Sequence, residues 1–404
     1  MKSFVKRCCL LLVLLKTMSS LCCSALSSQL LRGKKVLVTG GGRGIGRAIA
    51  LICHEEGADV IVTSRTQSEL EETVRLSYES IQDGENNDDE KQKRLKQSAI
   101  AATLLSRRGG RSVSRASDKT TSVGARRTGA ASKARMGRSS VSQLVDAVKT
   151  GSSSMAANGD SDTCDSRTNI MKYHVCDVTD ESQVDSMVRE IVSGDESDGK
   201  GIDILINNAG GAQSPKGPVG TLENQAFEQL LRLNVVGPQL VTSALCKYSP
   251  GWKPGEAEEL ESDPSPSKQK VVLNISSKAG KVGLQNYSFY VATKFALEGL
   301  TSSWAKELED RNIRVHSISP GMVNTQSFPK PAGKKGVREA SSIKDCLLLA
   351  LTGSISDSTP IVENMMDYTG HYIHVDEYDK VVNERGVENG HLAWKAIDED
   401  PFQV

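Results

Sequence analysis

Short apolar runs alternate with longer amphipathic segments along most of this chain of 404 residues. The short runs have the length of buried strands, and the longer segments repeat their apolar residues at helical spacing. Strands are predicted at residues 35–38, 58–62, 171–176, 202–206, 271–276, 314–319 and 372–375, and helices at 47–52, 181–192, 227–245 and 290–308. Alternation of this kind predicts a parallel sheet covered by helices on both faces. The predicted fold class is therefore α/β, with a doubly wound parallel sheet of about seven strands in a single domain over residues 31–384.

The alternation of strand and helix segments is interrupted between the second and third predicted strands. Residues 82–168 contain no Phe, Trp or Tyr, and residues 91–138 hold fourteen Lys or Arg against one acid, Asp118. Such a stretch cannot bury enough apolar surface to offset its loss of conformational entropy, so a long disordered insertion within the domain is predicted. Two roles remain open for it, a solvated loop or a basic arm that meets an acidic partner, a lipid surface or nucleic acid. The lack of aromatic residues that stack on bases argues against nucleic acid as that partner.

Residues 1–25 have the composition of a signal or targeting peptide. Lys2, Lys6 and Arg7 precede an apolar run over residues 8–15, and small residues follow up to Ala25. This order is typical of a secretory signal peptide, and the run is too short to span a bilayer, which takes about twenty residues. The secretory pathway or endoplasmic reticulum is therefore predicted. A mitochondrial or plastid presequence and a short membrane-associating tail are the alternatives.

Charge and cysteine content limit the kinds of binding site and cross-link that the chain can be expected to hold. The net charge is zero, because acids elsewhere balance the basic insertion. The acidic C-terminal stretch, residues 377–404, is predicted to pack on a neighbouring subunit or to cover the edge of its own sheet, and its residues 385–404 are predicted to form a tail beyond the domain. Four of the nine cysteines lie in the first 25 residues, and the others are scattered without metal-ligand spacing or a disulfide framework. No metal is predicted in the site.

A serine, a tyrosine and a lysine form the pattern with the clearest chemical meaning. Tyr290 and Lys294 stand four residues apart on a predicted helix, so the phenol and the ammonium share one face. A phenol has a pKa near 10, and a neighbouring cation favours the phenolate and lowers that pKa. Ser277 ends a predicted strand thirteen residues before the tyrosine and is placed to hold a substrate oxygen. The three residues are predicted to form a general acid–base site.

A glycine-rich turn follows the first predicted strand. Residues 39–46, Thr-Gly-Gly-Gly-Arg-Gly-Ile-Gly, lie between a strand and a helix, where backbone N–H groups bind the pyrophosphate of a dinucleotide. The turn predicts a Rossmann-type cofactor site that contains Thr39, Gly40, Arg43, Gly44, Ile45 and Gly46. The second strand leads into Ser64 and Arg65 without the acid that binds the ribose of NAD, whereas Arg43 and Arg65 suit a 2′-phosphate. NADPH/NADP+ is therefore the predicted cofactor.

Together these motifs resemble the short-chain dehydrogenase/reductase family, in its classical group, from about Lys34 to Asp376 outside the insertions. The resemblance implies a role for each further motif. It implies that cofactor contacts come from Asp177 and Val178 at the adenine, from Asn208, Ala209 and Gly210 after the fourth strand, and from Pro320, Gly321, Val323 and Thr325 at the nicotinamide. It also implies that Asn234 anchors a proton-relay water and that Lys294, beside Tyr290, binds the nicotinamide ribose.

The predicted activity is hydride transfer from NADPH to a ketone or aldehyde carbonyl, or the reverse oxidation of an alcohol. Tyr290 is predicted to donate the proton, Ser277 to hold the carbonyl oxygen and Lys294 to lower the tyrosine pKa. The alternatives are a 3-oxoacyl-[acyl-carrier-protein] reductase, an NADP(H)-sensing binding module whose basic arm contacts a partner, and an inactive relative that keeps only the fold. The short loop after Pro320 favours a small-molecule carbonyl substrate. The resemblance further implies a homo-oligomer, either a dimer or a tetramer.

Overall fold

The computed structural model describes residues 29–79, 169–193, 200–255, 269–326, 328–330, 334–355, 361–362 and 365–397. All of these residues belong to one compact unit. The predicted targeting segment 1–25 and the predicted insertion 82–168 lie outside the described residues, as does the end of the tail from residue 398.

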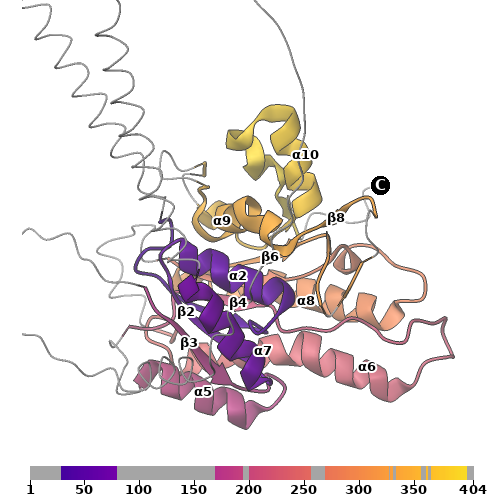
Figure 1. Ribbon diagram of the computed structural model, residues 1–404, viewed down its shortest axis with the longest axis horizontal. Helices are drawn as coiled ribbons and strands as arrows, with labels where there is room; N and C mark the ends of the chain where they lie inside the picture. The colour runs from indigo at the N-terminus through magenta and orange to yellow at the C-terminus, as the bar shows by residue number, and fades with distance from the viewer. Residues whose placement is uncertain are drawn as a thin grey trace, which may run out of the picture. The chain divides into compact units, whose positions relative to one another are not determined.

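A sheet of eight strands forms the centre of the described part of the chain (Figure 1). In spatial order its strands are β10 (Lys395–Ala396), β9 (His371–His374), β6 (Ile313–Ser319), β5 (Lys270–Ile275), β4 (Ile204–Asn207), β1 (Lys35–Thr39), β2 (Asp59–Ser64) and β3 (Met171–Val175). All neighbours pair in parallel except β10 and β9. The strand order reverses between β1 and β4, and ligands bind at the carboxyl ends of strands beside such a switch point. The predicted doubly wound α/β fold is confirmed.

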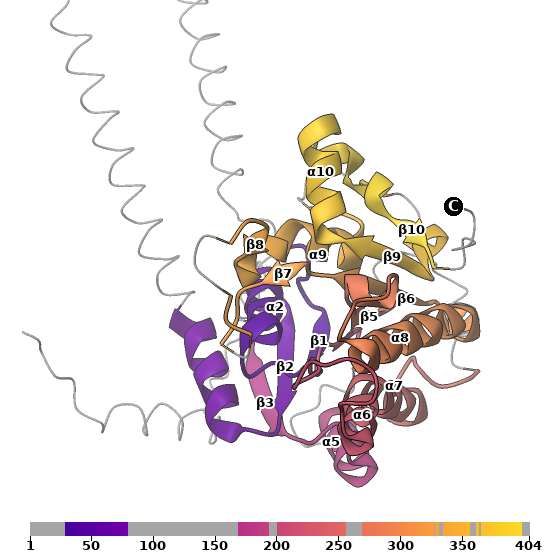
Figure 2. The ribbon, with the colours of Figure 1, turned by 90° about the vertical axis from the view of Figure 1, so that its right-hand side faces the viewer.

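The strands carry apolar side chains toward both faces of the sheet. In β1, Val36 and Val38 belong to one core cluster and Leu37 to the other, and all three are fully buried. Strands of this kind need a helical layer on each face. One face packs against α2 (Gly44–Glu55), α9 (Lys344–Thr352) and α10 (Val375–Arg385), and the other against α5 (Glu181–Ser193), α7 (Gly237–Tyr248) and α8 (Ser288–Glu307) (Figure 2).

The predicted helix at 227–245 is longer than expected and contains an irregular turn. It is built from α6 (Asn224–Leu231), a π-helical turn (Arg232–Val236) and α7. A π-turn adds a residue to one turn of a helix and occurs mostly at functional sites. Here it contains Asn234, whose side chain is buried.

The edge of the sheet holds one strand more than the seven predicted. Lys395 and Ala396 pair in antiparallel fashion with Tyr372 and His371 of β9. Two residues with no apolar alternation give no strand signal, so β10 was not predictable from its sequence. The described part of the predicted tail therefore covers the edge of its own sheet.

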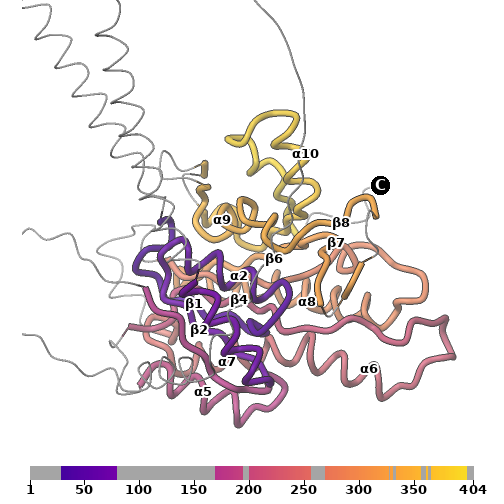
Figure 3. Tube along the Cα trace, in the orientation of Figure 1, coloured from indigo at the N-terminus to yellow at the C-terminus, as the bar shows by residue number. Residues whose placement is uncertain are grey.

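A smaller sheet follows β6. It pairs β7 (Met322–Val323) with β8 (Val337–Arg338), and residues 324–336 connect the two strands (Figure 3). Short 3-10 helices at Lys278–Gly280, Glu309–Arg311, Ala340–Ile343, Met365–Tyr368 and Val387–Ala393, with a helix over residues 67–79, complete the described elements.

Candidate active site

The predicted serine, tyrosine and lysine meet at the carboxyl end of β5. Ser277 follows this strand and caps a short 3-10 helix, where its Oγ accepts a hydrogen bond from the amide of Ala279. Tyr290 and Lys294 lie on α8, and the lysine Nζ is 5.9 Å from the centroid of the tyrosine ring. A hydrogen bond links the side chains of Ser277 and Tyr290. The three residues are therefore grouped as the sequence predicts.

Burial governs the protonation of this group. It raises the pKa of Tyr290 above its ordinary value near 10, and the hydrogen bond with Ser277 acts in the opposite direction. Burial also lowers the pKa of Lys294 to about 8, while the charge of Glu298 opposes that change. Lys294 Nζ donates to the carbonyl of Ile275 at 2.8 Å. In this structure the serine hydroxyl is the neighbour that lowers the tyrosine pKa, and the predicted effect of Lys294 on it stays a prediction.

Asn234 joins the same network from the π-turn. Its Oδ1 accepts from the amide of Gly211 at 2.8 Å, and its Nδ2 donates to the carbonyl of Gly211 at 2.9 Å and to Thr293 Oγ1 at 3.0 Å. Thr293 in turn donates to the carbonyl of Tyr290 at 2.8 Å. Asn234 is thus tied to the backbone of the tyrosine, although 56 residues separate them in the chain (290 − 234).

The glycine turn at the end of β1 has the form of a pyrophosphate cradle. Gly40 and Gly44 adopt positive φ angles of 67° and 58°, which favour glycine. At Gly46 an added Cβ would lie 2.2 Å from the carbonyl oxygen of Gly40, so only glycine fits there. Arg43, the N-cap of α2, makes no side-chain cap hydrogen bond, which leaves the first amides of this helix available to an anion. These features fit the pyrophosphate of a dinucleotide.

The segment after β4 fixes this turn from the side. Thr39 Oγ1 accepts from the amides of Asn208 and Ala209, both at 3.0 Å. The side-chain amide of Asn208 donates to the carbonyls of Thr39 and Gly40 at 2.9 and 3.2 Å. The predicted residues of β1 and β4 therefore form one hydrogen-bonded unit, and Gly210 follows it beside Asn234.

The predicted adenosine end carries two arginines that already have acidic neighbours. Arg43 Nη1 lies 3.0 Å from Glu69 Oε1, and Arg65 Nη1 lies 3.8 Å from Asp177 Oδ2. Both arginine side chains are more than half exposed, at 52% and 69%, so they are free to turn toward a ligand. Ser64 lies beside them at the end of β2, and Val178 is buried against Gly237. A 2′-phosphate fits this end if the arginines exchange partners.

The loop after β6 reaches back to the glycine turn. Pro320 and Val323 are buried, and an added Cβ at Gly44 would lie 3.4 Å from the side chain of Thr325. An added Cβ at Gly321, whose φ is 76°, would lie 3.0 Å from Asp376 Oδ1. The predicted nicotinamide loop and the predicted pyrophosphate turn are therefore neighbours.

Three residues of this site carry no sequence signal strong enough to have been predicted. Thr293 links Asn234 to Tyr290, the charge of Glu298 acts on the pKa of Lys294, and Gln213 contacts the start of α8. Only Glu298 has a recognisable spacing, because it follows Lys294 by four residues and therefore shares its helix face.

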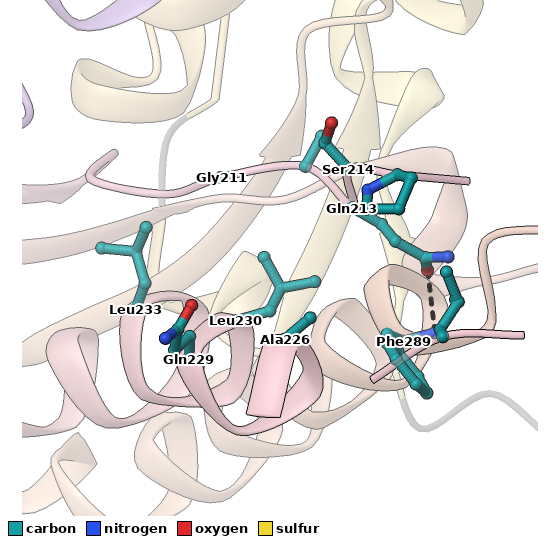
Figure 4. A pocket seen from close by; sticks show the side chains of 11 residues that line it. Gly211, Gln213, Ser214, Ala226, Gln229, Leu230, Leu233 and Phe289 are labelled. Atoms are coloured by element: carbon teal, nitrogen blue, oxygen red, sulfur yellow. Dashed lines mark hydrogen bonds between the residues drawn. The ribbon is translucent and has the colours of Figure 1, made fainter. Parts of the chain in front are cut away.

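A cavity of about 200 Å³ lies between the loop after β4, α6 and the first turn of α8 (Figure 4). Leu230, Leu233 and Phe289 make most of its wall apolar, and Gly211 and Gln213 belong to the loop above it.

Among the residues that the structure describes, no group of three or more His, Cys, Asp or Glu is placed to hold a metal ion. In the same residues, no helix has both the length and the apolar character needed to cross a membrane.

Comparison with known sequences gives the family. A family model of the short chain dehydrogenases matches residues 34–84 and 147–334, more than half of the chain. The 3-oxoacyl-[acyl-carrier-protein] reductase FabG of Thermotoga maritima is 29% identical over 157 residues, which are 39% of this chain and 55% of that protein. The L-xylo-3-hexulose reductase of Hypocrea jecorina is 31% identical over 187 residues, 46% of this chain and 53% of that protein. The chain thus spans little more than half the length of these two relatives.

Solved structures agree on the fold. A protein of Shigella flexneri assigned to the short-chain dehydrogenases and solved with NADP superposes with a TM-score of 0.50 at 19% identity, over 83% of this chain and 95% of its own. A protein of Sinorhizobium meliloti assigned to the short-chain alcohol dehydrogenases gives 0.50 at 20% identity, over 85% and 95%. With the matched sequence and this fold, the chain belongs to the short-chain dehydrogenase family.

Proposed function

We propose that the protein is an NADPH-dependent oxidoreductase that reduces a ketone or aldehyde carbonyl, or oxidises the corresponding alcohol. The observation that carries the proposal is the network that joins Asn234, Thr293 and Tyr290 beside Ser277 and Lys294. Family membership supports the type of reaction, since the relatives include reductases and a galactitol 2-dehydrogenase.

In this mechanism the phenol of Tyr290 is the general acid. It donates its proton to the carbonyl oxygen, while the Ser277 hydroxyl donates a hydrogen bond to the same oxygen and so fixes the carbonyl carbon in place. A bound nicotinamide supplies the hydride. Lys294, protonated below its pKa of about 8, stabilises the phenolate that forms. Asn234, which is linked to Tyr290 through Thr293, would hold the water that returns the proton.

The choice of NADPH over NADH rests on Arg65 and Arg43. The charge reversal Arg65→Asp is expected to lower kcat/KM for NADPH by about 10- to 100-fold, the equivalent of losing one hydrogen bond to a charged group. The kcat/KM for NADH should change little, because NADH has no 2′-phosphate. The ratio of kcat/KM for the two cofactors measures the effect, with Arg385→Asp on α10 as the control. A ratio left unchanged by Arg65→Asp would show that this arginine does not read the phosphate.

The surroundings of the site favour an apolar carbonyl compound. Val282 and Leu284 lie between Ser277 and Tyr290 in the chain, and Met322 and Phe328 lie in the segment after β6. These four side chains are between 37% and 40% exposed. A polyol would instead need polar side chains for its hydroxyl groups.

A 3-oxoacyl-[acyl-carrier-protein] reductase is the second candidate. Lys334 and Lys335 are exposed on the same loop, and no carboxylate in the described part of the chain forms an ion pair with either. Two unpaired cations beside an apolar surface suit an acyl chain borne by an acidic carrier. The resemblance to FabG is compatible with this candidate.

One assay tests both candidates. The oxidation of NADPH and NADH is measured with diketones, aldehydes, quinones and a 3-oxoacyl thioester, beside the Tyr290→Phe protein. We expect NADPH oxidation that Tyr290→Phe lowers by about 10²- to 10⁴-fold, with NADPH still bound. If the variant keeps most of its rate, Tyr290 is not the acid. Binding of NADPH without turnover of any carbonyl would favour an NADP(H)-sensing module.

A further inference from the structure

The first turn of α8 holds Tyr290 but lacks a cap of its own. Its N-cap residue, Tyr287, makes no side-chain cap hydrogen bond. The first amides of a helix have no partner within the helix, so they need one from outside. The amides of Phe289 and Tyr290 both donate to Oε1 of Gln213, at 3.0 and 3.2 Å. A loop residue far away in the chain therefore caps the helix that carries the proposed acid.

The side chain of Gln213 is itself buried and fixed by hydrogen bonds. Its side chain is 4% exposed, and its Nε2 donates to the carbonyl of Asn286 at 3.0 Å, just before the helix. Figure 4 shows the side chain crossing from the loop to Phe289. A buried amide pays a large desolvation penalty unless its groups are hydrogen-bonded, and both ends of this amide are. Its position is therefore fixed by three bonds to one segment.

The same loop also fixes Asn234. Gly211, two residues before Gln213, exchanges two hydrogen bonds with the Asn234 side chain. Asn234 then reaches the carbonyl of Tyr290 through Thr293. The loop thus holds the backbone of Tyr290 at its amide, through Gln213, and at its carbonyl, through Asn234 and Thr293.

We propose that Gln213 is a positioning residue that sets the hydroxyl of Tyr290 opposite Ser277. The inference rests on the proposed function, in which the tyrosine hydroxyl transfers a proton. Gln213 contacts the helix backbone and acts only through Tyr290. A misplacement of about 1 Å is enough to lower a rate by on the order of 10²-fold, so a loose first turn is costly for turnover.

Two substitutions at this position separate its roles. Gln213→Leu has a similar size but leaves the amides of Phe289 and Tyr290 without an acceptor. We expect its kcat to fall by on the order of 10²-fold, with the Kd for NADPH unchanged. Gln213→Glu keeps an acceptor for both amides, and a helix N-terminus favours negative charge. It loses the donor to the carbonyl of Asn286, so this variant should recover part of the rate that Gln213→Leu loses. A Gln213→Leu protein with the wild-type kcat, or a Gln213→Glu protein no better than Gln213→Leu, overturns the proposal.

A matched control separates positioning from general destabilisation. Trp252 is fully buried and donates through Nε1 to the carbonyl of Ile202 at 2.6 Å, just before β4 and at the opposite end of that strand from the loop. Trp252→Phe removes that buried hydrogen bond and should lower the Tm while kcat stays unchanged. If the two variants lower kcat alike for an equal fall in Tm, Gln213 has only a structural role and the proposal is wrong.

A measurement without turnover keeps the test independent of the proposed reaction. The near-ultraviolet titration of the wild-type protein minus that of Tyr290→Phe reports ionisation of the Tyr290 phenol. The hydrogen bond with Ser277 lowers the pKa of this phenol. The loss of alignment in Gln213→Leu should therefore raise the midpoint of the Tyr290 titration, measured as Gln213→Leu minus the protein that carries both substitutions. If no carbonyl is reduced but the midpoint rises, the proposed function fails and the positioning role stands. An unchanged midpoint overturns the positioning role.

Discussion

Glu298 lies one helical turn beyond Lys294 on α8, and its buried charge acts on the Lys294 ammonium. Glu298 is 3% exposed, and its two carboxylate oxygens share the hydrogen of the Ser317 hydroxyl, which lies 3.0 and 2.8 Å from them. One of these oxygens lies 3.4 Å from Lys281 Nζ. Burial lowers the Lys294 pKa to about 8, and Glu298 is the charge that opposes this change. The carboxylate therefore helps to keep the lysine protonated near neutral pH.

The substitution Glu298→Gln should move the pH dependence of the reductase. Lys294 loses its proton as the pH rises through its pKa, so the wild-type rate is expected to fall above a pH of about 8. Removing the Glu298 charge lowers the Lys294 pKa further, because nothing then opposes burial. The falling limb should shift to lower pH, and for each unit by which the Lys294 pKa falls, the rate well above pH 8 should drop about tenfold. A profile of kcat against pH measures this, with the exposed Glu309→Gln as control, and coincident limbs would contradict it.

The sequence predicted residues of the site when their chemistry and their spacing lay close together in the chain. Tyr290 and Lys294 are one helical turn apart, and the glycine turn is a single run between a strand and a helix. Gln213 escaped prediction because it acts on an amide 77 residues away, and a glutamine in a loop has no periodic signature. Its position follows from the topology that places the loop after β4 against α8.

Trp394 anchors the described part of the tail to the sheet. It follows the 3-10 helix Val387–Ala393, precedes β10 and is 7% exposed. Its ring packs edge-on against His316 of β6 with a centroid distance of 5.0 Å, and against Tyr368 at 5.7 Å. The segment that closes the edge of β9 is therefore held by core packing as well as by the β10–β9 pairing.

Trp394→Ala should accordingly lower the stability of the whole domain. Truncation of a buried tryptophan costs about 3–5 kcal/mol of the free energy of unfolding. Leu392 is 49% exposed on the same segment, so Leu392→Ala should change that energy by less than about 0.5 kcal/mol. Urea unfolding of both variants measures the difference. A small, equal loss in both would mean that the tail is only loosely attached.

Elements with strong periodicity were predicted within a few residues of their observed bounds. The helix predicted at 290–308 is α8 (Ser288–Glu307), and the strand predicted at 314–319 is β6 (Ile313–Ser319). The unpredicted elements are those that depend on tertiary contacts. The π-turn around Asn234 has an ordinary helical sequence, and β10 exists because β9 offers an edge for it.

At the scale of the whole molecule, both flanks of the 82–168 insertion meet at one residue. The ring of Tyr78 lies 6.3 Å from the ring of His54, and the side chain of Asn169 donates to the carbonyl of His54. His54 is in the last turn of α2, whereas the glycine turn, residues 39–46, leads into the first turn of the same helix. A helix of 12 residues is about 18 Å long, so Tyr78 and Asn169 contact α2 at the end far from the cofactor turn.

Replacing residues 82–168 by a Gly/Ser linker about one tenth as long should therefore leave kcat/KM unchanged. The two flanks already lie together, so the shorter loop closes without moving β2 or β3. Reducing the loop length about tenfold should add about 2 kcal/mol to the free energy of unfolding, because less entropy is lost on closing it. Steady-state kinetics and urea unfolding on the same protein measure the two effects. A sharp fall in kcat/KM with stability retained would mean that the basic segment takes part in function, as an arm that meets an acidic substrate carrier or partner.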